Sequence, residues 1–315
     1  MDKVLITGGL GYLGTELSKF LANRGYKVKI IDIGYFNNKL GTNNKNIKVI
    51  KKDLNNINVN DLKGFKKIIH LAAISNDPAA LLNSKITWET NVLSTLKLLE
   101  ICKISKIQQF IFVSSGSVYG VSKKKKVDEN TELLPLSDYN KTKMVGEKIV
   151  NNYKDFFNTV ILRPGTICGV SDSMRLDLTV NAMTYSALTK KIITVNGGNQ
   201  IRPQVHIKDM LNIFLFFLKR KKIQGVFNIG FENYSILKVA KMIKKKLKFS
   251  TINIKKEFDI RSYRLYSKKI LKKGFKHNFK VEDAISDIAE VYYDRKLNNS
   301  KQCYRTSYLS KKLQK

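Results

Sequence analysis

The chain has 315 residues, of which 43% are hydrophobic and 26% charged, with 18 Gly and only 4 Pro. This composition excludes a disordered or collagen-like chain, and the length suffices for one large domain or two lobes around a buried core. The longest apolar stretch, residues 213–218, is far shorter than the roughly 18 residues of a membrane span. Three scattered cysteines, Cys102, Cys168 and Cys303, exclude a disulfide framework and a CxxC metal site. Because a strand pattern begins directly after Met1, without a signal-peptide pattern, we expect a reduced, cytoplasmic protein without a metal.

The formal net charge of +33 points at first sight to nucleic acid or another anionic partner. The 58 basic residues, however, include only 9 arginines and are spread along the whole chain. Proteins that bind phosphates and bases favour the forked guanidinium of Arg. We therefore expect a solvated, lysine-rich surface and neither a nucleic-acid nor a membrane partner.

Strand and helix patterns alternate through the first half of the chain. Buried strands are predicted at residues 3–7, 27–32, 47–51, 67–71, 109–114 and 159–162, and helices at 11–24, 85–103 and 138–153. This alternation predicts an α/β fold, a Rossmann-type doubly wound parallel sheet.

The pattern loosens after residue 165. Short strands are predicted at 193–196, 226–229 and 251–254, and helices at 235–247 and 281–292. We expect an NAD-binding domain over 1–165 and a smaller C-terminal α+β substrate lobe over 166–315. Some segments of that lobe, around 203–245, are expected to pack back on the first domain.

A glycine-rich turn lies directly between the first predicted strand and the first predicted helix. Gly8, Gly11 and Gly14 have a GxxGxxG spacing, and Asp32 follows 18 residues later at the end of the second strand. The turn brings the backbone close to a pyrophosphate, and the helix N-terminus adds free N–H groups. A carboxylate at Asp32 accepts the adenosine ribose hydroxyls and repels a 2′-phosphate. The pattern predicts NAD as the cofactor; a turn in an unliganded βαβ fold is the alternative.

Tyr139 and Lys143 form a YxxxK motif. Five other tyrosines also have Lys four residues on, so the motif alone carries little weight. Tyr139, however, begins a predicted helix at the carboxyl end of the sheet, where doubly wound folds bind ligands. Lys143 lies one turn away, and its ammonium is expected to lower the pKa of the phenol so that Tyr139 acts as a base. Ser115, just past the fifth strand, is expected to hydrogen-bond the same substrate hydroxyl.

Several motifs occur together in one order along the chain. They are TGGxGYLG, Asp32, Asp53-Leu54, HLAA at 70–73, Asn91-Val-x-x-Thr95, SSxxVYG and YNKTK. In this combination the chain resembles the extended short-chain dehydrogenase/reductases and, more narrowly, the NAD-dependent nucleotide-sugar epimerase/dehydratase family, in particular its UDP-glucose 4-epimerase-like members. The resemblance runs from Met1 to about Asp294.

The resemblance implies roles for individual residues. It places Gly8, Gly11, Tyr12, Leu13 and Gly14 around the NAD pyrophosphate, Asp32 at the adenosine ribose, Asp53 and Leu54 at the adenine, and Leu71, Ala72 and Ala73 along the dinucleotide cleft. Lys143 would also bind the nicotinamide ribose, beside Tyr139, and Asn91 would be a mainly structural helix residue near the cofactor. Asn181 and Arg202, with Arg261 as a third residue, would bind the diphosphate of a nucleotide sugar. His206 is expected to be a packed residue at a strand end.

Two departures from the family bear on the reaction. Sugar 4,6-dehydratases of the family carry an Asp-Glu pair after the catalytic Ser or Thr, where this chain has Gly116 and Ser117. The extra acid–base groups of the ketoreductases and 3,5-epimerases are also missing near Ser117. The remaining Ser115, Tyr139 and Lys143 suffice for oxidation and reduction at one carbon. Thr166 stands where UDP-galactose 4-epimerases have Asn, so the nucleotide and the sugar stay open.

We therefore expect an NAD-dependent nucleotide-sugar epimerase that inverts a hexose at C4 through a 4-keto intermediate and supplies sugar for a surface polysaccharide. The alternatives are a C4 dehydrogenase or reductase, or a 4,6-dehydratase, with exchanging NAD(H), and a catalytically silent NAD-binding protein. By resemblance only, we expect a homodimer formed through the helices at 85–103 and 138–153.

Overall fold

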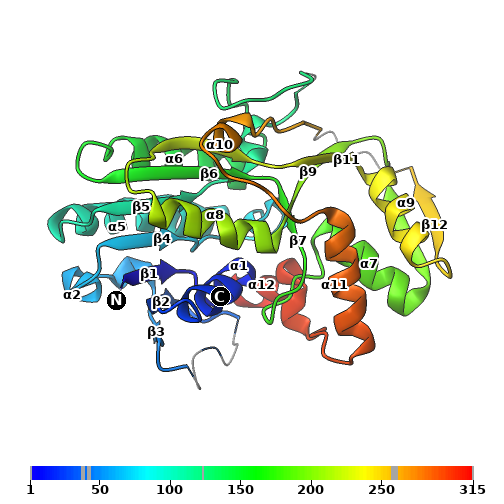
Figure 1. Cartoon of the computed structure of the whole chain (residues 1–315), viewed down its shortest axis with the longest axis horizontal. Coiled ribbons are helices and arrows are strands. Elements are labelled where there is room, and N and C mark those ends of the chain that lie inside the picture. Colours follow the sequence, from blue (N-terminus) through cyan, green and yellow to red (C-terminus); the bar gives the residue numbers. More distant parts are fainter. Residues whose placement is uncertain (1, 37–39, 41–43, 123, 257–261, 314–315) are drawn as a thin grey trace.

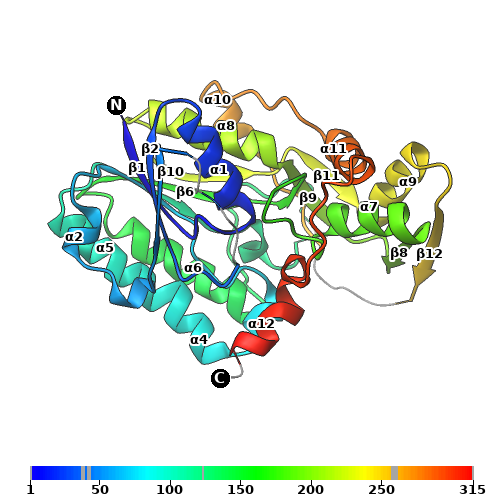
Figure 2. The ribbon, with the colours of Figure 1, turned by 90° about the horizontal axis from the view of Figure 1, so that it is seen from below.

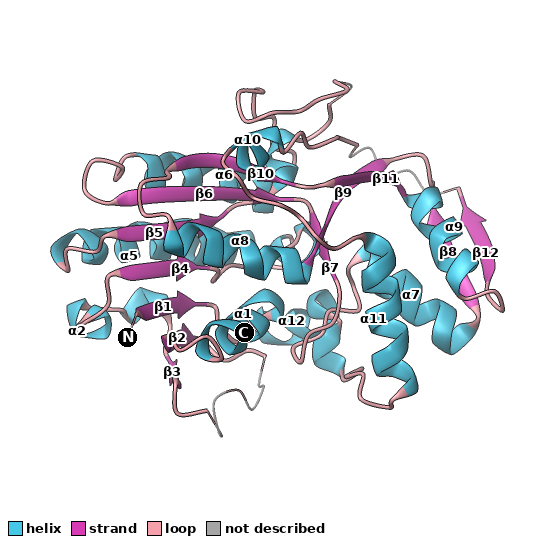
Figure 3. Cartoon of the chain, in the orientation of Figure 1, coloured by secondary structure: helices cyan, strands magenta, loops and turns pink. Residues whose placement is uncertain are grey.

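A seven-stranded parallel sheet forms the centre of the molecule (Figures 1 and 3). The computed structural model describes residues 2–36, 40, 44–122, 124–256 and 262–313. The strand order is β10-β6-β5-β4-β1-β2-β3, and every neighbouring pair is parallel. The predicted Rossmann-type fold is therefore confirmed. The strands are β1 (Lys3–Thr7), β2 (Lys27–Asp32), β3 (Ile47–Lys51), β4 (Lys67–His70), β5 (Gln109–Val113), β6 (Asn158–Pro164) and β10 (Gly225–Ile229).

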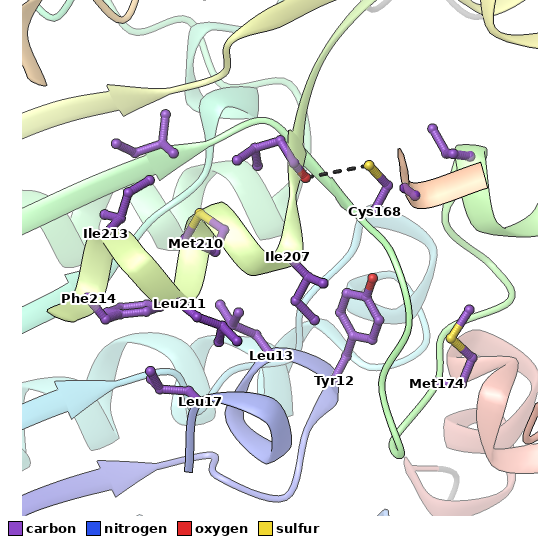
Figure 4. Packing of buried hydrophobic residues seen from close by; sticks show 14 of the residues in the cluster. Tyr12, Leu13, Leu17, Cys168, Met174, Ile207, Met210, Leu211, Ile213 and Phe214 are labelled. Atoms are coloured by element: carbon purple, nitrogen blue, oxygen red, sulfur yellow. Dashed lines mark hydrogen bonds between the residues drawn. The ribbon is translucent and has the colours of Figure 1, made fainter. Parts of the chain in front are cut away.

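Amphipathic helices cover both faces of this sheet (Figure 2). On one face, α1 (Tyr12–Ala22) packs against α8 (Ile207–Lys219), and on the other, α5 (Ser94–Ile104) packs against α6 (Asp138–Asn151). Figure 4 shows Leu13 and Leu17 of α1 facing apolar side chains of α8, which include Phe214. Burial on both faces explains why the central strands are almost continuously apolar.

The second lobe lies at the carboxyl end of the parallel strands, to the right in Figure 1. A three-stranded sheet contains β7 (Thr166–Cys168), β9 (Ile201–His206) and β11 (Glu232–Ser235), and β8 (Ile192–Asn196) pairs in parallel with β12 (Thr251–Lys255). Three helices pack on one another beside these strands: α7 (Thr179–Lys190), α9 (Ile236–Lys246) and α11 (Val281–Tyr293).

The remaining elements are short. They are α2 (Val59–Leu62), α3 (Asp77–Ala80), α4 (Ser84–Trp88), α10 (Lys268–Lys272), α12 (Arg305–Leu313) and the 3₁₀ turns η1 (Leu54–Asn56), η3 (Gly116–Tyr119) and η4 (Lys301–Cys303). Across the part of the chain that the structure describes, no helix has the length and apolar character to cross a membrane.

Several features differ from the elements predicted along the chain; α7, β7, β9 and β11, for example, are absent from the prediction. The strand predicted at 226–229 is β10, which pairs with β6 at the edge of the large sheet. An apolar strand pattern does not specify its partner, and this partner lies about 65 residues earlier in the parallel register. Residues 203–245 also contain α8, a helix absent from the predicted elements, because an apolar run such as 213–218 fits a strand or a helix equally well.

The helix predicted at 85–103 is divided into α4, a π-helical segment η2 (Glu89–Leu93) and α5. Within η2, the side chain of Asn91 accepts a hydrogen bond from Ile74 N (2.8 Å) and donates one to Ile74 O (3.1 Å). A π segment accommodates an extra residue in a helix and re-aims its side chains. Here it directs a buried amide at the loop after β4.

Candidate functional site

The glycine-rich turn between β1 and α1 is shaped by close backbone packing. Gly8 has φ +71°, and a Cβ there would lie 2.5 Å from Ala72 N, while a Cβ on Gly14 would lie 2.5 Å from Gly8 O. Gly11 differs: among the residues that the structure describes, and apart from its own chain neighbours and helix, a Cβ there would meet Gly8 O alone, at 3.4 Å. Gly11 is also the N-cap of α1, without a side-chain cap hydrogen bond. The turn therefore presents an open cradle above Gly11, beside the free N–H groups at the start of α1.

Asp32, the last residue of β2, lies beside this turn. Its carboxylate accepts hydrogen bonds from Leu10 N (3.0 Å) and Gly34 N (2.7 Å). Burial raises the pKa of Asp32, and the two backbone N–H groups oppose that rise. The carboxylate is thus fixed in position next to the cradle, with acceptor capacity left for a ribose hydroxyl.

The other residues expected at the dinucleotide lie at neighbouring strand ends. Asp53 caps η1 by accepting from Asn55 N (2.8 Å), and Leu54 is a buried core residue. Leu71 donates its N–H to Thr7 O, and Ala72 lies against Gly8 as described above. Ala73 continues that loop toward Ile74. Asn91 also donates to Thr142 Oγ1 (3.0 Å), so it ties the β4 loop to α6.

Ser115, Tyr139 and Lys143 come together at the carboxyl ends of β4 and β5. Ser115 caps η3, and Tyr139 lies in the first turn of α6. Burial raises the pKa of Tyr139 to about 12, against the opposing hydrogen bond from Ser115. Burial lowers the pKa of Lys143 to about 8, against the raising effect of Glu147, and the ammonium donates to Val113 O (2.8 Å). In the protein without ligand, the pKa of the Tyr139 phenol is therefore not lowered by Lys143 as expected. Burial dominates, and the Lys143 ammonium is directed at a backbone carbonyl.

Two polar groups that the motif analysis did not single out support these three residues. Ser117 Oγ lies 2.7 Å from Ser115 Oγ and donates to Asn140 Oδ1. Glu147, one helical turn beyond Lys143, forms a buried ion pair with Arg163 (Oε2–Nη2 2.6 Å, Oε1–Nε 2.9 Å). The i, i+4 spacing from Lys143 to Glu147 was a sequence signal for this carboxylate.

The loop after β7 folds over the start of α1. Ser171 donates to Tyr12 O (2.8 Å), and the Tyr12 hydroxyl donates to Gly169 O (2.7 Å). Leu13 packs into the core between α1 and α8. In the same loop, the buried guanidinium of Arg175 pairs with Asp177 through Nε (2.9 Å) and Nη2 (3.0 Å).

The residues expected at the substrate diphosphate lie in different surroundings. Asn181 is completely buried, and its amide is used within the protein: it accepts from Gly169 N (3.0 Å) and donates to Arg175 O (3.0 Å). Its side chain thus ties the loop to α7. Arg202 is partly exposed on β9, and Arg261 lies outside the described residues. His206 is buried, caps α8 and stacks on Phe279, which agrees with a packed strand-end residue.

Within the described ranges, no group of three or more His, Cys, Asp or Glu side chains could hold a metal ion. The candidate site described above consists of a glycine cradle, one acidic strand end and the Ser115, Tyr139 and Lys143 side chains.

Several known proteins are similar to this chain in sequence and in fold. The model of the family described as "NAD dependent epimerase/dehydratase family" matches residues 4–230. The chain is 34% identical over 258 residues to a protein of Bacillus subtilis (strain 168) named as an uncharacterized UDP-glucose epimerase, YtcB, covering 76% of this chain and 81% of that protein. It is 30% identical over 273 residues to a dTDP-D-glucose 4,6-dehydratase of Dictyostelium discoideum, covering 77% and 62%. A solved structure of UDP-glucuronic acid 4-epimerase from Bacillus cereus, in complex with UDP-glucuronic acid and NAD, superposes with a TM-score of 0.81 and 29% identity over 92% of this chain and 100% of that one.

Proposed function

Because the chain belongs to the NAD-dependent epimerase/dehydratase family, we propose that it is a nucleotide-sugar 4-epimerase, which inverts a hexose at C4 through a transient 4-keto sugar. The observation that carries this proposal is the set of Ser115, Tyr139 and Lys143 at the sheet end, with no carboxyl side chain at positions 116 and 117. Such a set supports oxidation and reduction at one carbon and offers no acid or base for removing water.

The residues around the glycine-rich turn fit NAD. The open position above Gly11 leaves room for a pyrophosphate beside the N-terminus of α1, and Asp32 would accept the ribose hydroxyls of the adenosine. Asp53 and Leu54 would flank the adenine, and Ala72 with Ala73 would line the cleft. NAD, when bound, supplies a hydride acceptor that also returns the hydride.

Proton transfer falls to Tyr139. Its phenolate oxygen would accept the proton of the 4-hydroxyl as the C4 hydrogen leaves, and would give it back once the keto sugar has turned over in the site. The Ser115 hydroxyl would orient that oxygen, since it already hydrogen-bonds Tyr139. Lys143 would favour the phenolate through its positive charge and bind the nicotinamide ribose. Arg202, with Arg261, would hold the substrate diphosphate while the sugar rotates.

Packing around Gly116 favours this reaction over a 4,6-dehydration. A Cβ at Gly116 would lie 2.8 Å from the Leu265 side chain and 3.1 Å from Pro164 O. A side chain at this position would require Leu265 to shift and would crowd Pro164 O, which disfavours the carboxylate that the dehydratases carry there. Ser117, at the second of those positions, is occupied by its hydrogen bonds to Ser115 and Asn140.

We also propose that the protein is a homodimer. Large apolar side chains are exposed along η2 and α5: Leu93 is 56% exposed and Leu96 40%. A second copy packed on this face would cover them, and light scattering of the purified protein tests the expected doubled mass.

The test is an NMR time course with a panel of UDP-, GDP-, CDP- and dTDP-sugars, without added cofactor. A C4 epimer that accumulates without net NADH supports the epimerase and identifies the substrate. Turnover only with stoichiometric NAD or NADH would identify a dehydrogenase or reductase, and a 4-keto-6-deoxy product a dehydratase.

Tyr139→Phe is expected to abolish turnover while NAD remains bound, because only the phenol oxygen is removed. Tyr292→Phe is the matched control, since Tyr292 also has Lys four residues on but lies on α11, in the second lobe. It should retain wild-type turnover. More than a few per cent of activity in Tyr139→Phe would contradict the assignment.

A further inference from the structure

The C-terminal helix α12, red in Figure 2, contacts loops on both sides of the glycine-rich turn. The tyrosine ring of Tyr308 lies 5.9 Å from that of Phe36, which follows β2. Leu309 and Leu313 pack into a cluster with Ala79 and Ala80 of α3, which follows β4. Since β1 lies between β2 and β4 in the sheet, a helix that contacts both flanking loops spans the end of β1, where the glycine-rich turn begins.

Arg305, the first residue of α12, is the polar residue at this crossing. Only 4% of it is exposed, and its guanidinium lies 3.6 Å from the centre of the Phe36 ring. Nη2 donates to Ser173 O (2.9 Å) and Ser173 Oγ (2.7 Å). Ser173 belongs to the same loop as Ser171, whose hydroxyl donates to Tyr12 O at the start of α1. Arg305 is thus held between the β2 loop and the loop that covers the N-terminus of α1.

The charge around Arg305 is unbalanced. Burial lowers its pKa to about 10, and the second guanidinium, on Arg175, lowers it further, while Asp177, Cys303 and Asp32 oppose the shift. Asp177 is already paired in a bidentate manner with Arg175. Among the residues that the structure describes, no carboxylate lies within 4.0 Å of Arg305. A buried cation that lacks an anion is unfavourable by itself and becomes favourable when an anion binds beside it.

We propose that Arg305 binds the diphosphate of the dinucleotide and that α12 thereby straps the bound cofactor in place. The inference rests on the proposed function, which makes NAD the bound dinucleotide. The cofactor's diphosphate is favoured over that of the nucleotide sugar for two reasons. The loop that holds Arg305 also hydrogen-bonds Tyr12 at the start of α1, and the charge of Asp32, at the proposed adenosine end of the site, acts on Arg305. An epimerase gains from such a strap, since one NAD must serve both the oxidation and the return of the hydride.

The experiment measures NAD release and affinity in the full chain. Protein loaded with NAD is desalted and its NAD content followed with time, and the dissociation constant is measured by calorimetry. Arg305→Met keeps the length of the side chain and its packing on Phe36 but removes the charge and the fork. Loss of a charge-assisted hydrogen bond of ordinary strength predicts that NAD is released faster and that its dissociation constant rises, each by about ten- to a hundredfold. Arg305→Lys keeps the charge without the fork, so its NAD release rate and affinity should lie between those of wild type and Arg305→Met.

Arg24→Met is the matched control. Arg24 also lies 3.6 Å above a phenylalanine ring, that of Phe20, but it is exposed in the turn that follows α1, at the end of that helix opposite the glycine-rich turn. Its removal should leave NAD release unchanged. Thermal unfolding separates binding from folding: without NAD the Arg305→Met and wild-type midpoints should agree within a few degrees, and the increase caused by saturating NAD should be smaller in the variant.

Arg305→Met that keeps NAD as long as wild type does would overturn the inference. So would a variant in which NAD affinity is intact but UDP binding to the NAD-loaded protein is weakened, because Arg305 would then serve the substrate diphosphate. If Arg305→Met does not fold, the same measurement is made on Ser173→Ala, which removes the hydrogen bond from the guanidinium to Ser173 Oγ. The expected loss of NAD affinity is then smaller. A wild-type protein that binds no NAD would refute the proposed function instead.

Discussion

The buried ion pair beneath the site provides the sharpest test of how this fold is stabilised. Glu147 and Arg163 are 5% and 6% exposed and share three hydrogen bonds, Oε2–Nη2 at 2.6 Å, Oε1–Nε at 2.9 Å and Oε2–Nε at 3.1 Å. Ser114 donates to Glu147 (2.5 Å), and Arg163 also donates to the Tyr119 hydroxyl (2.6 Å). Burial works against the charged Arg163, but Glu147 outweighs it and the pKa of Arg163 is raised.

Glu147→Gln removes the negative charge and leaves Arg163 buried without a counter-ion. Breaking a buried pair in this way lowers the free energy of unfolding by about 3–5 kcal/mol. With a urea dependence of about 3 kcal/mol per M, the unfolding midpoint should fall by about 1–1.7 M. The double variant Glu147→Gln, Arg163→Met should recover much of this loss, since it removes both charges.

The assay is urea unfolding at pH 7, followed by the fluorescence of Trp88, the single tryptophan. Asp294→Asn is the control, because Asp294 pairs with Lys296 at 2.9 Å with both side chains at least half exposed. Exposed pairs contribute about 0–1 kcal/mol, so the control midpoint should move little. A Glu147→Gln midpoint as close to wild type as that of the control would refute the reasoning.

Lys143→Met should abolish turnover yet stabilise the ligand-free protein at pH 7, because burial lowers the pKa of Lys143 from 10.5 to about 8. Between pH 8 and pH 10.5 the unfolded chain binds more protons at Lys143 than the native protein does. The unfolding free energy of wild type therefore rises with pH relative to that of the variant, by about 3 kcal/mol. Equal urea midpoints of the two proteins at both pH 7 and pH 10 would contradict this. Gly11→Ala should weaken NAD binding in calorimetry without shifting the urea midpoint, whereas Gly14→Ala, whose methyl would lie 2.5 Å from Gly8 O, should lower the unfolding free energy by about 1–3 kcal/mol. Wild-type NAD affinity in Gly11→Ala would show that the pyrophosphate lies elsewhere.

Local patterns in the sequence were sufficient to predict the first six strands of the sheet and to locate the motifs at the ends of those strands. Strand and helix periods are properties of neighbouring residues, and the carboxyl ends of parallel strands necessarily meet at one edge. For that reason the glycine-rich turn, Asp32, Ser115 and Tyr139 could be placed near one another without coordinates. The division of the helix at 85–103 could not be predicted, because it follows from the hydrogen bonds of Asn91 to Ile74 in another loop.

By itself, then, the sequence determined the Rossmann-type sheet, the NAD-dependent family and the candidate Ser115, Tyr139 and Lys143 set, since each is encoded in short segments. Only the tertiary structure decided that β10 completes the large sheet, that Asn181 is used inside the protein and that Glu147 is neutralised by Arg163. It alone brought Arg305 close enough to Asp32, 273 positions earlier in the chain, for their charges to interact. Contacts between residues so far apart in the chain depend on how whole elements pack. The periodicity of a segment shows which of its faces is buried but not which distant element covers that face.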